Sequence, residues 1–402
     1  MSDAVTKPEG HAYGRRAQHS SKLLTEVGPG TPMGELMRRY WQPVALSREV
    51  TDLPRKVKVL GEDLIVFRDR RGRAGLLYPR CMHRGTSLFY GKIEDEGIRC
   101  CYHGWLFDTQ GRCLDQPCEP DRGRHRDAAR QPWYPVEERY GLIFAYLGPP
   151  ARKPVLPRYD ILEEIRPDQQ LLTLLGGFGS TGDLSLEVTP YSWLHMNDNV
   201  MDPFHVHVLH STFTGPQFAS GFLVMPTVDF FHIDAGVCYS AHRKLDDGRE
   251  MQRVSTWLMP NIMSVPDISL EHGPSNMMSW VVPCDDSSYR QAMVMKLPRS
   301  FAVSEEWGIK LGGKRWGEMT EEEHQRTPGD FEAQAGQGPI SLHSEEHLVM
   351  SDRGIIMQRK VLQQQCELVA NGGDPVGVAF EADKALVRVP SGNFYEHKSA
   401  VG

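Results

Sequence analysis

Two short segments of this chain each contain one cysteine and one histidine. Cys81 and His83 form the first pair, and Cys100 and His103 form the second pair, sixteen residues further along. Such side chains bind zinc or iron–sulfur clusters, and four ligands that must meet constrain the fold of both segments. Zinc fingers pair cysteine with cysteine and histidine with histidine, whereas each of these two segments supplies one cysteine and one histidine. The pattern therefore favours a 2Fe–2S cluster in which two thiolates hold one iron and two imidazoles hold the other.

Composition and charge argue against several other classes of protein. The 402 residues carry a formal net charge of −7, without the positive field of a nucleic-acid-binding protein. No apolar run approaches the roughly 18 residues of a membrane-spanning helix, and residues 1–21 lack the apolar core of a secretory signal. We therefore expect a cytoplasmic protein that binds neither nucleic acid nor membrane. Thiols stay reduced in that compartment, so the eight cysteines are expected to be ligands or core residues rather than disulfides.

The length suggests two domains, and local patterns indicate where they divide. Thr31, followed by proline, has the character of a helix N-cap. Residues 45–148 alternate short apolar runs with polar turns and predict an all-β region. The prolines and charges of residues 148–154 interrupt both helical and strand periodicity and indicate a linker. We therefore place one domain at residues 1–154 and the other at residues 155–402.

The second domain mixes helical and strand-like patterns. A helical segment surrounds residues 193–209, and a strand-rich region covers residues 222–297. A final amphipathic helix is predicted from Ser351, and the Asn-Gly-Gly sequence at residues 371–373 ends it. This mixture predicts an α+β fold.

The densest group of histidines in the chain lies beside an aspartate, within the predicted helical segment. The group contains Asp202, His205, His207 and His210. Two histidines and one carboxylate are the ligands of mononuclear non-haem Fe(II), and they leave positions open for O₂ and substrate. On a helix, Asp202 and His205 face the same way, but His205 and His210 lie about 140° apart. Helical geometry alone therefore favours His207 with His210.

The cysteine–histidine loops resemble those of a known family. Cys81-Met-His-Arg-Gly85 and Cys100-Cys-Tyr-His-Gly-Trp105 are similar to the two ligand loops of the Rieske domain in aromatic-ring-hydroxylating oxygenases, in their oxygenase (alpha) component. Met82 stands where proline is usual, and Cys101 is a rival that the C-x-x-H spacing disfavours. The resemblance implies an all-β Rieske domain, then an α+β catalytic domain with an antiparallel sheet and flanking helices. It also implies four ligands to the 2Fe–2S cluster: Cys81, His83, Cys100 and His103.

The histidine group resembles the iron motif of the same family, Asn-x-x-Asp-x-x-His-x4-His. The motif maps onto Asn199, Asp202, His205 and His210. The resemblance therefore selects His205 with His210 as iron ligands, and it requires the helix to bend or end before His210. The third ligand follows from a likeness to phthalate-dioxygenase-like members, which carry an aspartate eight residues before Gly-Pro-Ile. That position is Asp330, with Glu346 and Asp352 as rivals.

The resemblance also implies partners and a route for electrons. The chain has no glycine-rich dinucleotide fingerprint, so electrons from NADH would arrive through a separate reductase that carries flavin and an iron–sulfur cluster, with or without a ferredoxin. The family is typically a homotrimer in which one subunit's Rieske cluster supplies its neighbour's iron. Asp202 would bridge the two centres, between His205 and His103 of the partner subunit. O₂ would be the co-substrate.

The substrate is the least constrained part of the interpretation. The resemblance implies a small aromatic substrate, first of all a carboxylate, with residues 213–290 supplying much of the pocket. The spacing from Asn199 to Asp202 favours O-demethylation or other monooxygenation, and ring cis-dihydroxylation is the alternative. Two other classes stay open: a Rieske electron-transfer protein without oxygenase activity, and a zinc-binding module. Several residues could line the pocket but are more often core residues: Met225, Met263, Met277, Met278 and Trp280.

Overall fold

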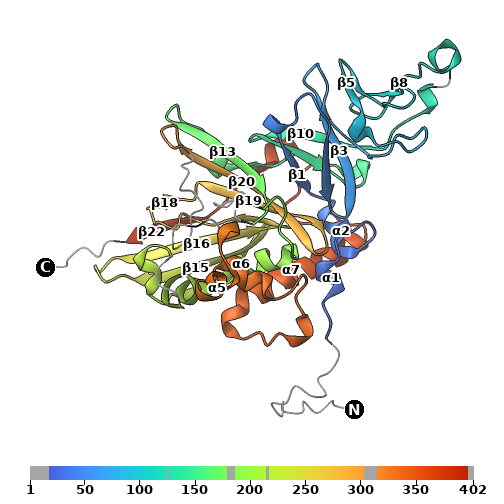
Figure 1. Ribbon diagram of the computed structural model, residues 1–402. Helices are drawn as coiled ribbons and strands as arrows, with labels where there is room; N and C mark the ends of the chain where they lie inside the picture. The colour runs from blue at the N-terminus through green and yellow to red at the C-terminus, as the bar shows by residue number, and fades with distance from the viewer. Residues whose placement is uncertain are drawn as a thin grey trace, which may run out of the picture.

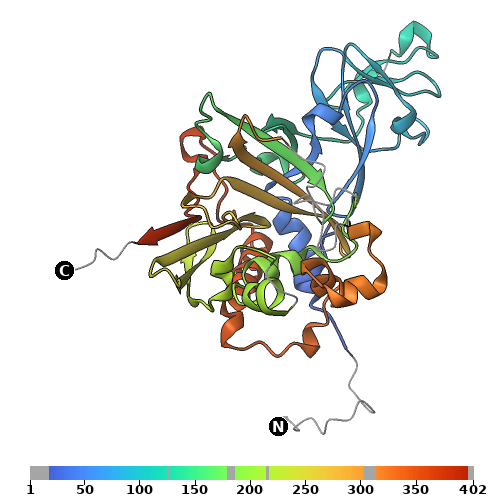
Figure 2. The same ribbon diagram turned by 60° about the vertical axis from the view of Figure 1, so that its left-hand side comes forward.

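The structure is a computed structural model, and it describes residues 18–124, 126–178, 186–213, 217–302, 314 and 316–396. Figure 1 shows a small all-strand part at the upper right and a larger part in which helices lie along one long sheet. The same two parts are seen from another side in Figure 2, where the helices again gather on the side of the sheet away from the small part. This arrangement confirms the expected fold class.

Short strands build the small part. They are β2 (Arg55–Val59), β3 (Glu62–Arg68), β4 (Ala74–Leu77), β5 (Lys92–Glu94), β6 (Gly97–Arg99), β7 (Leu106–Phe107), β8 (Cys113–Asp115) and β9 (Trp133–Tyr134). They form two four-stranded sheets, in the orders β2–β3–β4–β9 and β5–β6–β7–β8. Phe67, Ile98 and Phe107 are fully buried in a core that also contains Cys81 and Cys100. Packing of the strands therefore fixes the base of both cysteine-bearing loops.

A third sheet joins the small part to the larger one. It consists of β1 (Trp41–Leu46), β10 (Val136–Arg139) and β11 (Leu142–Tyr146), in the order β1–β11–β10. Every residue of β1 and β11 is buried, and the ring of Phe144 in β11 meets Trp280 of the larger part edge-on, with 5.7 Å between ring centroids. This sheet shares its core with the larger part, and the boundary at residues 148–154 stays a prediction.

A nine-stranded antiparallel sheet forms the centre of the larger part. Its strands are β13 (Gln169–Gly176), β14 (Thr227–Ile233), β15 (Gly236–Lys244), β16 (Glu250–Leu258), β17 (Ile262–Ser264), β18 (Gly273–Pro274), β19 (Met277–Asp285), β20 (Ser288–Pro298) and β22 (Gly392–Glu396). The main order is β13–β20–β19–β17–β16–β15–β14, and β22 pairs with both β16 and β18. The strand-rich prediction for residues 222–297 is confirmed from Thr227 onward. Residue 222 itself lies in a short 3-10 helix.

Two predicted helices pack against each other beside this sheet. Helix α2 (Pro32–Met37) begins where expected, because the Thr31 hydroxyl accepts a hydrogen bond from the Gly34 amide. Helix α7 (Arg353–Ala370) starts two residues after the predicted Ser351 and ends before Gly372, whose φ of +81° suits glycine. A shorter helix, α1 (Lys22–Thr25), precedes α2. Among the residues that the structure describes, no helix has the length and apolar character needed to cross a membrane.

The predicted helical segment at residues 193–209 is broken in the structure. Helix α3 (Trp193–Val200) ends before Asp202, since the following Pro203 disfavours a helical conformation at the residue before it. The Asp202 carboxylate then accepts hydrogen bonds from the amides of Phe204 and His205, which starts α4 (His205–His207). A π-helix at Val208–Phe213 continues directly from α4. The helix thus breaks once and changes from α to π once around the predicted iron motif.

Candidate active site

Two matching tight turns carry the cysteine–histidine pairs. The first follows β4, and the second joins β6 to β7. In the first, the Cys81 amide donates to the Thr86 carbonyl at 2.8 Å and the Gly85 amide donates to the Cys81 carbonyl at 2.8 Å. In the second, the Cys100 amide donates to the Trp105 carbonyl at 2.8 Å, and a glycine closes the turn in the same way. Gly85 has φ of +78° and its counterpart Gly104 has φ of +72°, so both turns use a conformation that favours glycine.

The four predicted cluster residues meet at the tips of these turns. The His83 and His103 rings lie edge to face, with 4.5 Å between centroids. Cys81 and Cys100 are buried, and burial raises the pKa of the Cys81 thiol to about 12, with the neighbouring Cys100 adding to the rise. A pair of thiolates in this position therefore needs nearby positive charge, which a cluster's iron supplies.

The spacing of the four donors separates a two-iron cluster from a single zinc. A tetrahedral zinc would draw three or four donor atoms close around one point. In the described part of the chain, the set of three donors that meets within 4.8 Å lies elsewhere, and no three of these four do so. A binuclear cluster places its two pairs of ligands on different irons, so the observed spread fits it better. Cys101 is exposed, whereas Cys100 is buried, and this difference matches the choice of Cys100.

A buried glutamine supports the first turn, and no sequence motif indicated it. Gln131 is completely buried, and its Oε1 accepts a hydrogen bond from the Met82 amide at 2.8 Å. Its Nε2 donates to the carbonyls of Tyr78 and Arg80. Trp105 also contributes, because its ring stacks on His83 at 4.6 Å with the two planes nearly parallel. These contacts orient the His83 loop.

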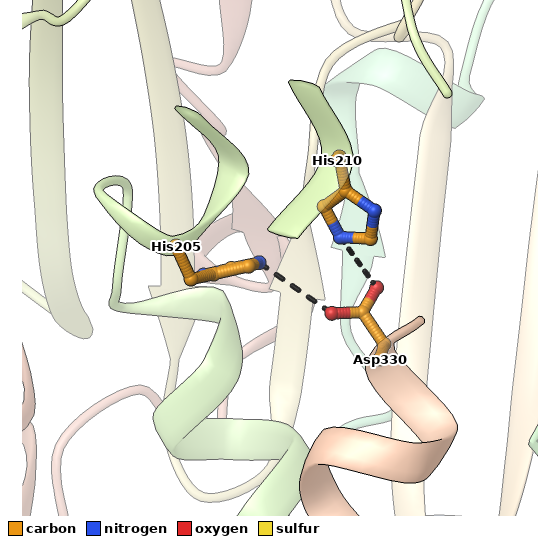
Figure 3. A group of neighbouring side chains, drawn as sticks. All are labelled: His205, His210 and Asp330. Carbon is orange, nitrogen blue, oxygen red and sulfur yellow. Dashed lines mark ion pairs between the residues drawn. The ribbon is translucent and has the colours of Figure 1, made fainter. Parts of the chain in front are cut away.

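The three predicted iron ligands, His205, His210 and Asp330, also converge, as Figure 3 shows. His205 Nε2 lies 3.5 Å from Asp330 Oδ1, and His210 Nε2 lies 3.1 Å from Asp330 Oδ2. His205 comes from α4, His210 from the π-helix, and Asp330 from the first position of α6 (Asp330–Ala335). Their possible ligand atoms all lie within 4.8 Å of one another, which makes the set a candidate mononuclear metal site.

The π-helix explains why five-residue spacing works here. A π-helix turns less per residue than an α-helix, so the change from α4 to the π-helix between His205 and His210 brings the two residues closer to one face than a regular helix would. The His205 and His210 rings accordingly lie 5.5 Å apart between centroids. The pairing of His207 with His210 that regular helical geometry favoured is not formed, since His207 Nδ1 instead faces the Phe222 carbonyl at 3.3 Å.

The rivals for the third position lie in other contacts. Glu346 forms an ion pair with Arg359, with Nη1 and Oε2 2.5 Å apart. Asp352 accepts a hydrogen bond from the Val349 amide at 2.7 Å. Asp330 is thus the carboxylate that the fold brings to His205 and His210.

The charge on Asp330 is stabilised by its neighbours. Burial alone would raise the pKa of this carboxyl, but the hydrogen bond to His210 and the proximity of His205 hold the pKa well below its usual range. Asn199, at the end of α3, donates from Nδ2 to Asp330 Oδ1 at 2.9 Å. The site therefore contains an ionised carboxylate whose orientation Asn199 helps to fix.

The other ring nitrogen of His210 contacts a glutamine. Gln217 Nε2 donates to the Pro328 carbonyl at 3.4 Å, which turns its Oε1 toward His210. His210 Nδ1 can then donate to this oxygen at 2.9 Å. With Nδ1 directed at Gln217, Nε2 is the ring nitrogen that faces the Asp330 carboxylate and is placed to bind a metal. The donor set therefore fits a divalent metal.

Asp202 lies on the opposite side of the His205 ring. Its Oδ2 is 3.6 Å from His205 Nδ1, close but longer than a hydrogen bond. Burial tends to raise the pKa of Asp202, yet His205 and the amides at the start of α4 lower it overall. Asp202 is therefore an ionised group behind His205 and outside the three converging donors.

A large cavity opens beside His205, His210 and Asp330. It has a volume of about 910 Å³, which suits a ligand of drug-like size. Met263 and Met277 line it, as the sequence suggested they could, whereas Met278 and Trp280 are core residues and Met225 is half exposed. Sequence reasoning missed several lining residues that have no motif, among them Arg253, Asn276, Gln291, Met293 and Met295.

Comparison with known proteins gives consistent results for the family. The model of the Rieske [2Fe-2S] domain matches residues 40–135. The chain is 55% identical over 390 residues to the phenoxybenzoate dioxygenase subunit alpha of Ectopseudomonas oleovorans, with 96% of this chain and 94% of that protein covered. It is also 33% identical over 396 residues to the 5,5'-dehydrodivanillate O-demethylase oxygenase subunit of Sphingobium sp. (strain NBRC 103272 / SYK-6), covering 94% of this chain and 84% of that protein.

A solved structure shares the fold. NdmA of Pseudomonas putida CBB5 superposes with a TM-score of 0.60 at 19% sequence identity, and the match covers 88% of this chain and 99% of that one. The likeness extends over both the strand-rich part and the long sheet with its helices.

Proposed function

Because the chain belongs to the Rieske non-haem iron oxygenases, as an oxygenase (alpha) subunit, we propose that it adds oxygen to an aromatic carboxylate held in the cavity beside His205, His210 and Asp330. The observation that carries this proposal is the convergence of these three donors, from three separate elements, on the wall of a large cavity. An electron-transfer protein without oxygenase activity would need neither the donors nor the cavity.

In this proposal the two sets of donors hold different metals. Cys81, His83, Cys100 and His103 would hold the 2Fe–2S cluster, which stores and passes single electrons. His205, His210 and Asp330 would hold Fe(II), which supplies O₂ chemistry when bound. Two residues orient the iron ligands: Asn199 holds the Asp330 carboxylate, and Gln217 holds the His210 ring.

Electrons would reach the chain from outside. The relatives are named as subunits of oxygenases, which implies a separate reductase. We propose that this reductase takes electrons from NADH through flavin and iron–sulfur groups. We also propose a homotrimer in which Asp202 lies between His205 and His103 of the partner subunit. Its position behind the Nδ1 face of His205 supports that role.

The two candidate reactions differ in their products and in where the two oxygen atoms of O₂ go. Ring dioxygenation adds both atoms of O₂ to the substrate and consumes two electrons and two protons. O-demethylation converts an aryl methyl ether, O₂, two electrons and two protons into a phenol, formaldehyde and water. The relative at 55% identity is named a dioxygenase, so we propose ring dioxygenation of a phenoxybenzoate-like acid. The O-demethylation favoured by the Asn199–Asp202 spacing is the competing outcome.

Product analysis decides between them. The purified chain, loaded with iron and supplied with a reductase and NADH, is incubated with 3-phenoxybenzoate, 4-phenoxybenzoate and methoxybenzoates under ¹⁸O₂. Two ¹⁸O atoms in the ring product, without formaldehyde, support the proposal. Stoichiometric formaldehyde from a methoxybenzoate supports demethylation instead. Consumption of NADH without any oxygenated product from these acids would refute the proposed substrate class.

A further inference from the structure

Two buried arginines lie side by side on the sheet that forms one wall of the cavity. Arg243 is on β15 and Arg253 on β16, and the strand register places both on the same face. Each has only 3% of its surface exposed, and Arg253 lines the cavity itself. Arginine is almost never buried this fully unless it is paired with an acid.

Among the residues that the structure describes, neither arginine forms an ion pair with an acid, although the Asp267 carboxylate also lines the cavity and opposes the lowering of the Arg253 pKa by burial. Arg253 donates from Nη1 to the Asp267 carbonyl and to Asn393 Oδ1, both at 2.8 Å, and from Nη2 to the Pro266 carbonyl at 2.7 Å. All three acceptors are uncharged. The Asp267 carboxylate accepts instead from the amide and hydroxyl of Ser269, at 2.8 and 2.5 Å.

Arg243 has fewer hydrogen-bond acceptors than Arg253 among the described residues. Its Nε donates to the Val224 carbonyl at 3.0 Å, while its Nη1 is buried without a hydrogen-bond partner. Burial is the main cause that lowers the pKa of Arg243 to about 10, and the nearby Arg253 contributes to the decrease. In the described part of the chain neither arginine forms an ion pair, whereas the buried Arg359 has both Asp198 and Glu346.

Both cations contact the same aromatic ring. Both guanidinium carbons are 5.2 Å from the centroid of the Phe222 ring, which is 1% exposed. Phe222 in turn meets Phe218 edge-on at 5.7 Å, and Phe218 stacks on His210 at 4.3 Å. The cationic pair and the metal-site histidine are therefore connected by two aromatic rings along one cavity.

Two buried cations without an ion pair among the described residues are costly, and an anion in the cavity would relieve that cost. The hydrogen bonds to fixed carbonyls hold the Arg253 guanidinium in one orientation. Three of its five N–H groups are used in these bonds, and the groups that act on the guanidinium include the Tyr239 hydroxyl and the Asp267 carboxylate. A planar fork of donors held in this way matches a carboxylate.

We propose that Arg253, with Arg243 adding to the positive field behind Phe222, binds the carboxylate of the substrate and so selects anionic over neutral aromatic compounds. The inference rests on the proposed function, because it assumes that the cavity receives the substrate. It goes further in assigning recognition of the acid group to one side chain, away from the metal donors.

The test measures binding without turnover. Isothermal titration of the iron-loaded protein with 3-phenoxybenzoate is compared with titration with neutral 3-phenoxybenzyl alcohol, in the absence of reductase and O₂. Wild-type protein should bind the acid more tightly. Arg253→Gln should weaken binding of the acid roughly 10- to 100-fold and leave binding of the alcohol nearly unchanged, since a charge-assisted hydrogen bond is lost. Arg253→Lys should recover part of the affinity.

Matched controls exclude a general effect. Arg249→Gln removes an exposed arginine that pairs with Asp247 just before β16, and it should bind the acid as wild type does. Circular dichroism and the visible spectrum of the cluster show whether each variant is folded. If Arg253→Gln does not fold, the wild-type preference for acid over alcohol and the affinity of Arg253→Lys decide. Equal affinity of wild type for acid and alcohol, or undiminished acid binding by folded Arg253→Gln, overturns the inference.

The two proposals can fail separately. Acids that bind through Arg253 but yield no oxygenated product would refute the proposed reaction and leave this inference standing. Oxygenation of neutral aromatics with the same KM as acids would refute the inference while the oxygenase reaction stands.

Discussion

Replacing Gln217 with leucine tests how the metal site is held together. Gln217 Oε1 accepts the Nδ1 proton of His210 at 2.9 Å and thereby leaves Nε2 free for a metal. Leucine fills a similar volume but accepts no hydrogen bond. The His210 ring could then carry its proton on Nε2 or rotate away from Asp330, and both changes weaken metal binding.

The size of the effect follows from this contact. A buried hydrogen bond whose partner is charged or metal-bound contributes roughly 1.5–3 kcal/mol. Loss of a partner that orients a metal-binding histidine typically lowers metal affinity about 10- to 100-fold, which agrees with that range. The Pro328 contact is longer, at 3.4 Å, and we assign it only the orientation of the amide. We therefore expect Gln217→Leu to lose roughly 10- to 100-fold in Fe(II) affinity.

The assay is an anaerobic competition between the protein and a chelator for Fe(II), with the visible spectrum of the cluster recorded in parallel. The spectrum should not change, because Gln217 is far from the cysteine loops in sequence and fold. Gln217→Glu keeps an acceptor and should bind Fe(II) at least as well as wild type. Gln170→Leu, which removes a partly exposed glutamine bonded to the Pro298 and Phe301 carbonyls, is a control away from the metal donors. Wild-type iron affinity in Gln217→Leu would refute the assigned role of the glutamine.

Three further outcomes are expected. Iron and acid-labile sulfide analysis of anaerobically purified protein should give three irons and two sulfides per chain, with a Rieske-type EPR signal after reduction, and a colourless zinc protein would contradict both sets of assigned ligands. Asp202→Asn should keep both metals but lose most turnover, because an amide cannot replace the charge-assisted hydrogen bonds of the carboxylate, and loss of iron would instead make Asp202 a ligand. Leu362→Ala should lower the free energy of unfolding by about 2–5 kcal/mol in urea denaturation, because removal of this fully buried side chain of α7 would leave a cavity. An unchanged denaturation midpoint would mean that the surrounding core closes the cavity.

The cysteine loops show where sequence reasoning is strong. Their ligands lie within a few residues of each other, and glycines at Gly85 and Gly104 mark turns that need a positive φ. Local spacing and backbone chemistry are therefore both visible in the sequence. Pro203 also marks the break after α3, but the helical segment predicted at residues 193–209 ran through it and was wrong there.

Other features depend on contacts that a sequence does not display. Regular helical geometry favoured the pairing of His207 with His210. That pairing was wrong, because no local sequence pattern predicts a π-helix. Asp330 reaches the histidines across more than one hundred residues, so only the family resemblance indicated it. Arg253 has no motif, and its unpaired charge appears only when its strand neighbours are known.

The π-helix has a consequence for how the site opens. In this segment, side-chain hydroxyl groups donate hydrogen bonds to two backbone carbonyls. Ser211 Oγ donates to the Val206 carbonyl at 3.1 Å, and Thr212 Oγ1 donates to the His207 carbonyl at 3.2 Å. We expect the free energy of local opening to be lower for such a segment than for a regular helix like α7. Amide hydrogens of residues 205–213 should therefore exchange with solvent by local opening, well before the chain unfolds as a whole. Metal bound to His205 and His210 would close this opening, and metal loss and backbone exchange in this segment should rise and fall together.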